Sequence, residues 1–190
     1  MWYFSVKKIS QAPCMINFHT IEYLREGNNK QQRAHRTLVN YAVLQKLNEF
    51  DPRLVGTIPL DIDIEGSDLD IICCWKNKNR FIETVIESFA DQREFLLSER
   101  KILNRETILA TFLLDEFTVE IFGQNRPTKE QDAYRHMIAE YFILTQNDNH
   151  FRESIRKLKK EGLTTEEAFA KLLNLPGDPY LELLTFGASN

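Results

Sequence analysis

The chain has 190 residues, of which 43% are hydrophobic and 11% aromatic, and it carries a formal net charge of −4. This composition is ample for a packed core and excludes a largely disordered chain, while the acidic balance argues against a strongly basic nucleic-acid surface. No apolar run approaches the length that a membrane span needs, and the start lacks the charge order of a secretory signal. We therefore expect a cytoplasmic protein with no membrane partner.

The first half of the chain alternates helical and strand-like segments. Residues 1–14 share no pattern with the rest and are expected to form a peripheral extension. A short helix is then expected before Gly27, and apolar residues at helical spacing predict a longer helix over 30–49. The segments that follow are a strand at Arg53–Thr57, a loop at 58–67, a strand at Asp68–Trp75 and a helix at 78–91.

Three strands and a helical half complete the pattern. Short polar links suit hairpins between strands at about 94–103, 107–114 and 117–122. From residue 129 onward the apolar spacing is helical, with stripes at 134–144 and 151–158 and short helices at 164–174 and 179–186. The fold class expected is α+β: a mixed β-sheet with flanking helices in a core over 15–125, and a helical region over 126–190 packed on that core as one compact unit.

Two aspartates stand at the start of the second strand. Asp68 and Asp70 are separated by one residue, so on a strand they share a face, where like charges repel unless a cation lies between them. Oxygen ligands of this kind suit Mg²⁺ or Mn²⁺. The alternative is a surface strand with two solvated acids, which the unbroken apolar run Ile71–Cys73 disfavours. Upstream, Gly56 and Thr57 form a small turn where the backbone could approach a phosphate.

A third acid lies on the last predicted strand. Glu120 is flanked by Val119 and Ile121, so it could join the two aspartates across the sheet. Three carboxylates holding two divalent ions would align an attacking hydroxyl with the α-phosphate of a nucleotide. The alternative is an exposed glutamate on a half-buried strand.

The order of these motifs resembles the DNA polymerase β-like nucleotidyltransferase superfamily. The resemblance implies a mixed sheet, three metal-binding and catalytic carboxylates at Asp68, Asp70 and Glu120, and a nucleotide-phosphate turn at Gly56 and Thr57. More narrowly, the segments Gly-Thr-Ile-Pro-Leu, Ser-Asp-Leu-Asp-Ile-Ile-Cys, Glu-Ile-Phe-Gly-Gln and Ala-Tyr-Arg-His-Met look like a bacterial family of nucleotidyltransferase-like proteins without an assigned substrate.

Further polar residues extend the expected nucleotide-binding set. Ser67 precedes the aspartates, and Gln124 follows the strand of Glu120. Arg135 could meet a triphosphate or could pair with a nearby acid, and His136 could bind substrate or act as a base, or pack locally. The basic residues of 152–160 could contact RNA phosphates, but the acidic residues among them and the acidic chain as a whole favour a solvated helix face.

These expectations combine into one function with an alternative. The first is metal-dependent transfer of a nucleoside monophosphate from a nucleoside triphosphate to a hydroxyl of a small molecule, an RNA or a protein, with Mg²⁺ or Mn²⁺ as cofactor. The alternative is a non-catalytic nucleotide-binding or regulatory protein of the same fold.

Overall fold

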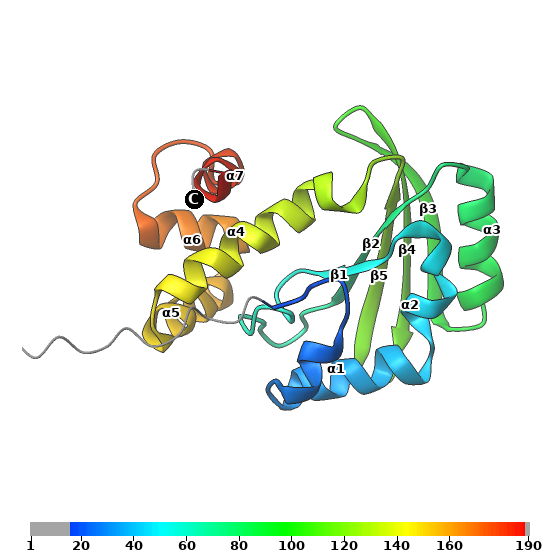
Figure 1. The fold of residues 1–190 in the computed structure, drawn as a ribbon, viewed down its shortest axis with the longest axis horizontal. Coiled ribbons are helices and arrows are strands. Elements are labelled where there is room, and N and C mark those ends of the chain that lie inside the picture. The colour runs from blue at the N-terminus through cyan, green and yellow to red at the C-terminus, as the bar shows by residue number, and fades with distance from the viewer. Residues whose placement is uncertain (1–15, 189–190) are drawn as a thin grey trace, which may run out of the picture.

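A mixed five-stranded sheet organises the molecule (Figure 1). The structure, a computed structural model, describes residues 16–188, so the extension expected at 1–14 lies outside the described residues. The strand order is β1-β2-β5-β4-β3; β2 and β5 are parallel and the other neighbouring pairs are antiparallel. The α+β class with a mixed sheet is thus confirmed. The strands are β1 (Arg53–Val55), β2 (Leu69–Cys74), β3 (Arg93–Ile102), β4 (Arg105–Leu114) and β5 (Phe117–Gln124).

Helices flank the sheet and fill the second half of the chain. The α-helices are α1 (Asn29–Asn40), α2 (Val43–Lys46), α3 (Lys78–Phe89), α4 (Asp132–Gln146), α5 (Asn149–Lys160), α6 (Thr165–Leu173) and α7 (Pro179–Ala188). Three short 3₁₀ helices are η1 (Glu22–Glu26), η2 (Asn48–Phe50) and η3 (Thr128–Glu130). Among residues 16–188, no helix combines the length and the apolar character that crossing a bilayer requires.

The single helix predicted over 30–49 is wrong. The chain turns after α1, where Ala42 takes a left-handed conformation with φ of 54°, and continues as α2 and η2. The turn redirects the chain so that Val43 and Leu47 are fully buried in the same core as Leu38. Tertiary packing therefore overrides the local helical preference of this segment.

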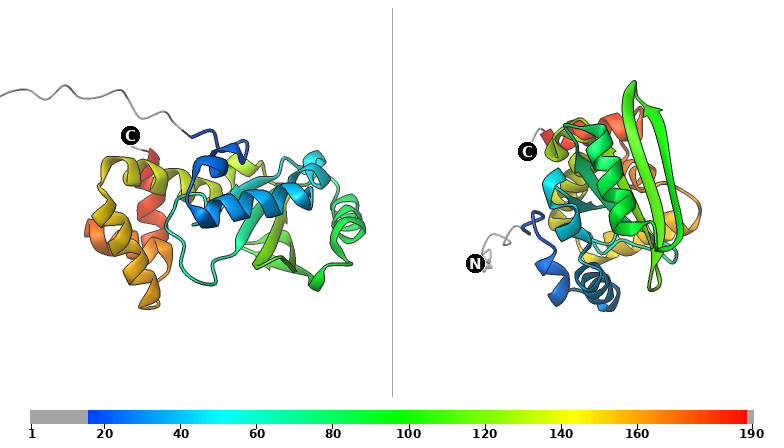
Figure 2. Two further views of the ribbon diagram at one scale, coloured as in Figure 1. Left: turned by 90° about the horizontal axis from the view of Figure 1, so that it is seen from below. Right: turned by 90° about the vertical axis from the view of Figure 1, so that its right-hand side faces the viewer.

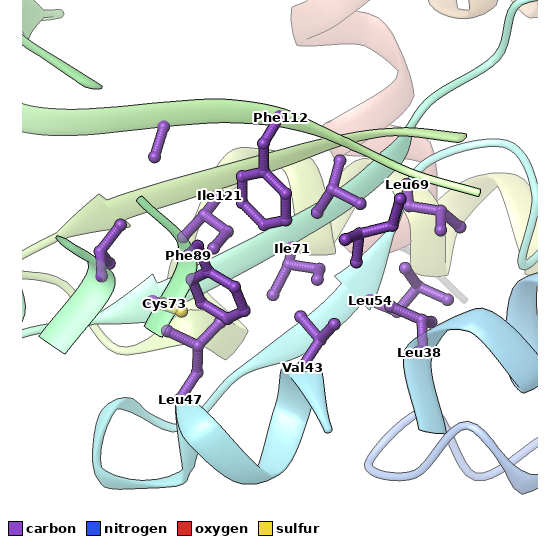
Figure 3. Packing of buried hydrophobic residues seen from close by; sticks show 14 of the residues in the cluster. Leu38, Val43, Leu47, Leu54, Leu69, Ile71, Cys73, Phe89, Phe112 and Ile121 are labelled. Carbon is purple, nitrogen blue, oxygen red and sulfur yellow. The ribbon is translucent and has the colours of Figure 1, made fainter. Parts of the chain in front are cut away.

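One face of the sheet builds the main core (Figure 3). Ile71 of β2 and Ile121 of β5 point to this face, where residues of α1, α2 and α3 pack on them. Gly123 lies on the same face, and a Cβ there would come 2.2 Å from the ring of Phe81 on α3, so the close approach of α3 requires glycine. Because side chains alternate along a strand, Asp70 and Glu120 point to the opposite face.

The opposite face of the sheet meets the helical second half. Figure 1 shows α4 running from the sheet toward α5, α6 and α7, and Figure 2 shows these helices gathered at one end of the molecule. A second core joins them to the first half of the chain: Met137, Ile155 and Phe169 pack in one cluster with Ile62 and Ile72. The end of α4 nearest the sheet therefore borders the face that carries the acids.

Candidate active site

Strand pairing brings the second aspartate and the glutamate together. In the parallel pair of β2 and β5, Asp70 lies directly beside Glu120, and in the antiparallel pair of β1 and β2 it lies beside Val55. Asp68 stands just before β2, where its carboxylate accepts a hydrogen bond from the hydroxyl of Thr118. Asp70 and Glu120 are therefore neighbours on the sheet, and Asp68 is close enough for its charge to act on both.

The charges of these acids oppose one another. Burial, and then the charges of Glu120 and Asp68, raise the pKa of Asp70 to about 7. Burial and the charge of Asp68 raise the pKa of Glu120, against the opposing effect of Arg100. Burial also raises the pKa of Asp68, while the hydrogen bond from Thr118 lowers it. Each carboxylate is thus destabilised in its ionised form, which is the condition that a bound cation relieves.

The turn after β1 places backbone against this acid pair. Gly56 has a φ of 85°, and a Cβ at that position would come 2.3 Å from Oδ2 of Asp70, so no larger residue fits without displacing the carboxylate. The carbonyl of Thr57 accepts hydrogen bonds from two amides of the following loop. The hydroxyl of Thr57 lies 3.5 Å from that of Ser67, whose oxygen accepts the amide of Ile64 at 3.0 Å. Ser67 therefore closes the loop and ties its end to the turn.

Loop 58–67 is held from the side of α5. Arg152 donates to the carbonyl of Leu60 at 2.9 Å, Lys159 donates to that of Ile62 at 3.0 Å, and Arg156 donates to both the carbonyl and the carboxylate of the intervening Asp61. Three successive carbonyls are thus bound by three basic side chains of one helix. This structural role accounts for much of the basic stretch that the sequence left open as an RNA-binding surface.

The same loop is held from the side of α1. Gln31 is buried and donates to the carbonyl of Ile58 at 2.8 Å, while Lys30 donates to that of Ile64 at 2.9 Å. With α1 on one side and α5 on the other, the segment joining the Gly56 turn to Asp68 is fixed at both ends and in its middle. The turn at Gly56 and the acid Asp68, which stand at the two ends of this loop, are therefore held at a fixed separation.

A cavity of about 390 Å³ opens on this face of the sheet. The sheet side of its lining includes Gly56, Thr57, Asp70, Glu120 and Gln124, so five of the predicted site residues share one cavity. Its other wall is the first half of α4 together with the start of α6. Asp68 and Ser67 instead line a neighbouring hollow, beside Lys30 and Thr118.

Gln124 and Arg135 were both predicted to bind nucleotide, but only Gln124 lines the cavity. Gln124 is buried in the cavity wall and donates to the hydroxyl of Thr107 at 2.8 Å, which fixes its amide. Arg135 is exposed and does not line the cavity. Its guanidinium lies 3.6 Å from the carboxylate of Asp132 one turn earlier, which matches the alternative expected from the sequence, an ion pair with a nearby acid. Sequence reasoning overlooked Arg126, which does line the cavity.

The helical wall holds a group of buried ionisable residues. His136 is bound at both ring nitrogens, 3.1 Å from Oε1 of Glu166 and 3.0 Å from the carbonyl of Tyr180. Burial alone would lower the pKa of His136, but the hydrogen bond and charge of Glu166 and the charge of Glu140 raise it overall. Glu140 was missed from the sequence; its only signal was its position four residues after His136, on the same face of the helix.

The donor set of the acid pair fits a hard divalent cation. Such a cation takes oxygen ligands, and Mg²⁺ is usually held by one or two carboxylates together with substrate phosphates rather than by an all-protein cage. Asp70 and Glu120 supply those two carboxylates, and Asp68 is near enough to affect both. Over residues 16–188, no group of three or more His, Cys, Asp or Glu side chains is placed to hold a metal ion, so the two carboxylates would need oxygen ligands from a substrate as well.

Comparison with known proteins identifies the family and the fold. Residues 36–186 match the family described as "Domain of unknown function (DUF4269)". The comparison with curated proteins found no match. Among solved structures, the Cid1 poly(U) polymerase with MgGTP bound is similar at a TM-score of 0.50 and 10% identity, over 73% of this chain and 46% of that one.

Two further solved structures lie just below that similarity. The GLD-2/RNP-8 complex gives a TM-score of 0.49 at 15% identity, covering 80% of this chain and 61% of that one. The polymerase core of TRAMP, an RNA surveillance complex, gives 0.48 at 14% identity, covering 85% and 58%. The chain spans about half the length of the structures it matches. At these identities the similarity establishes a nucleotidyltransferase-like fold and no more.

Proposed function

From the membership of this chain in the DUF4269 family, and from its nucleotidyltransferase-like fold, we propose that it is a metal-dependent nucleotidyltransferase. It transfers a nucleoside monophosphate from a nucleoside triphosphate to a hydroxyl group of an acceptor. The observation that carries the proposal is the pairing of Asp70 with Glu120 on adjacent parallel strands, with the backbone of Gly56 against Asp70 and a cavity in front of all three.

The residues divide the chemistry between them. Asp70 and Glu120, with Asp68 beside them, would hold Mg²⁺ or Mn²⁺, which when bound neutralises charge on the phosphates. The backbone of the turn at Gly56 and Thr57 would bind the β- and γ-phosphates, since the absence of a side chain at Gly56 lets this backbone lie against the carboxylate of Asp70. These contacts hold the triphosphate in the orientation that in-line displacement requires.

The transfer step exchanges one phosphorus–oxygen bond for another. The acceptor oxygen forms a bond to the α-phosphorus, and the bond from that phosphorus to the oxygen bridging to the β-phosphate breaks. Pyrophosphate leaves with the electron pair of that bond. The acceptor proton passes to Glu120, which stands beside Asp70 and lines the cavity.

The test follows the label of the α-phosphate. The full chain is incubated with each α-labelled nucleoside triphosphate, Mg²⁺ or Mn²⁺ and a pool of cell-extract acceptors, and both transferred label and pyrophosphate are measured. Transfer by the wild type is expected to fall at least a hundredfold in Glu120→Gln with little change in nucleotide affinity, because the loss falls on the transition state.

A matched control variant separates the loss of the Glu120 carboxylate from any general effect of replacing a glutamate by glutamine. Glu87 is an exposed glutamate of α3, on the other face of the sheet, so Glu87→Gln should retain full transfer. Release of γ-phosphate without transferred α-label would replace the proposal with a hydrolase. Nucleotide binding with no transfer across the acceptor pool would replace it with the non-catalytic, regulatory alternative.

A further inference from the structure

Glu140 is a buried acid that faces the cavity without a partner. It lies in the middle of α4, only 4% of its surface is exposed, and it contributes to the cavity wall opposite the sheet. Within residues 16–188 its carboxylate makes no hydrogen bond and no ion pair. A carboxyl group in this position is costly to ionise, because burial takes it out of bulk water and no described side chain forms an ion pair with it.

The nearby cations are already engaged. Both ring nitrogens of His136 are bound, to Glu166 and to a backbone carbonyl. Arg126 lies 3.2 Å from Asp132. Lys159 acts on Glu140 through its charge, but its ammonium group donates to the carbonyl of Ile62. Glu140 is therefore an acid of this wall with which no described residue forms an ion pair, although the charges of His136 and Lys159 lower its pKa.

A second acceptor of the same cavity also lacks a donor. The side-chain nitrogen of Gln131 donates to the carbonyls of Cys73 and Arg126, at 2.9 and 3.0 Å, which fixes the orientation of the amide. Its oxygen Oε1 is buried and has no partner. Gln131 lines the cavity as the residue just before α4, but this oxygen has almost no accessible surface, so Glu140 is the acceptor through which the cavity favours a ligand that donates N–H or O–H groups.

We propose that the cavity binds an amino alcohol or amino sugar, whose protonated amine pairs with Glu140. One of its hydroxyl groups supplies the acceptor oxygen of the transfer, so this assignment rests on the proposed function. The cavity volume of about 390 Å³ falls in the range of small-molecule sites. Met137, Phe122 and Ile102 supply apolar surface for the carbon skeleton.

The binding test uses probes that differ only in charge. Glucosamine, and a panel of amino sugars and amino alcohols, are titrated into the full chain by calorimetry, each against the analogue in which a hydroxyl replaces the amine, such as glucose. For at least one pair, the wild type should bind the amine about tenfold or more tightly than its neutral analogue. Glu140→Gln should remove that difference, whereas Glu87→Gln should preserve it.

The outcomes separate amine binding at Glu140 from the proposed nucleotidyl transfer. Amine binding is measured without nucleotide or metal, so it should persist in Asp70→Asn even though transfer is lost. Equal affinity for amines and their neutral analogues, no binding at 10 mM probe, or an undiminished preference in Glu140→Gln would each overturn the assignment. A changed preference among nucleoside triphosphates in Glu140→Gln would overturn it too, by making Glu140 a residue that contacts the nucleobase.

Discussion

The contact between the turn and the acid pair can be tested with one methyl group. Gly56→Ala places a Cβ 2.3 Å from Oδ2 of Asp70, in a backbone conformation with φ of 85°. The backbone term costs about 1–2 kcal/mol for any residue other than glycine. The overlap forces the half-buried carboxylate of Asp70 to move beside Glu120, which adds about 1–3 kcal/mol on the scale of overpacked cores. The total expected loss of stability is thus about 2–5 kcal/mol.

The chain provides a matched control for the backbone term. Gly66 has a φ of 78°, and a Cβ there would have no heavy atom within 4 Å, so Gly66→Ala should cost only about 1–2 kcal/mol. Urea unfolding of both variants at pH 7 gives the difference between them, provided that the dependence on denaturant is unchanged.

A double-mutant cycle assigns that difference to Asp70. In an Asp70→Ala background the carboxylate is absent, so Gly56→Ala should cost no more than Gly66→Ala does in the wild type. Equal costs for the two glycine substitutions in the wild type would refute the contact. An excess cost of Gly56→Ala that survives in Asp70→Ala would show that the strain arises elsewhere.

Further substitutions test the charges and the loop. The pKa of Glu140 is raised to about 8 in the folded state, so the wild type should lose stability as the pH rises from about 4.5 through about 8. Glu140→Gln has no such group to ionise and should not show this loss. By pH 9 the free energies of unfolding of the two proteins in urea should differ by up to about 5 kcal/mol. Asp70→Asn should abolish the rise in melting temperature that Mg²⁺ produces in the wild type; an equal rise in both would remove the site from Asp70. Asp68→Asn should leave metal-free stability unchanged or raise it by about 1 kcal/mol, whereas a loss above about 2 kcal/mol would make it a structural acceptor for Thr118. Arg156→Ala should speed amide hydrogen exchange in loop 58–67 while leaving exchange in β5 unchanged; uniform exchange in both proteins would show that the loop does not depend on α5.

The sequence predicted the elements of the sheet because each one carries its own signal. Alternation along β5 placed Glu120 on a face, and the spacing of Asp68 and Asp70 placed both on one face. That Asp70 stands directly beside Glu120 is a matter of register between strands nearly fifty residues apart, which no local pattern contains. The motif order, through the family it resembles, supplied that juxtaposition.

The prediction of one helix over 30–49 failed because contacts between residues far apart in the sequence determine where the chain turns. Nothing in Tyr41 or Ala42 signals a break, since alanine is the best helix former; the turn follows from the burial of Val43 and Leu47. The sequence also leaves open where Arg135 lies: it is exposed and outside the cavity lining, a position that depends on how α4 packs. Periodicity locates a helix, but it does not fix which polar face of that helix meets a cavity.

The free-energy cost of placing two ionised acids side by side on one face of the sheet is offset by the apolar core on the other face. Asp70 and Glu120 are half-buried beside each other, and each raises the free energy of the folded state while it stays ionised. The opposite face compensates with a continuous core around residues such as Ile71 and Ile121, the immediate neighbours of the two acids on the same strands. A structural acid would instead be paired where it stands, as Asp61 is with Arg156. An acid pair that forms no ion pair with any described residue, backed by a stabilising core and facing a cavity, is the arrangement expected where a ligand and its metal ions supply further positive charge.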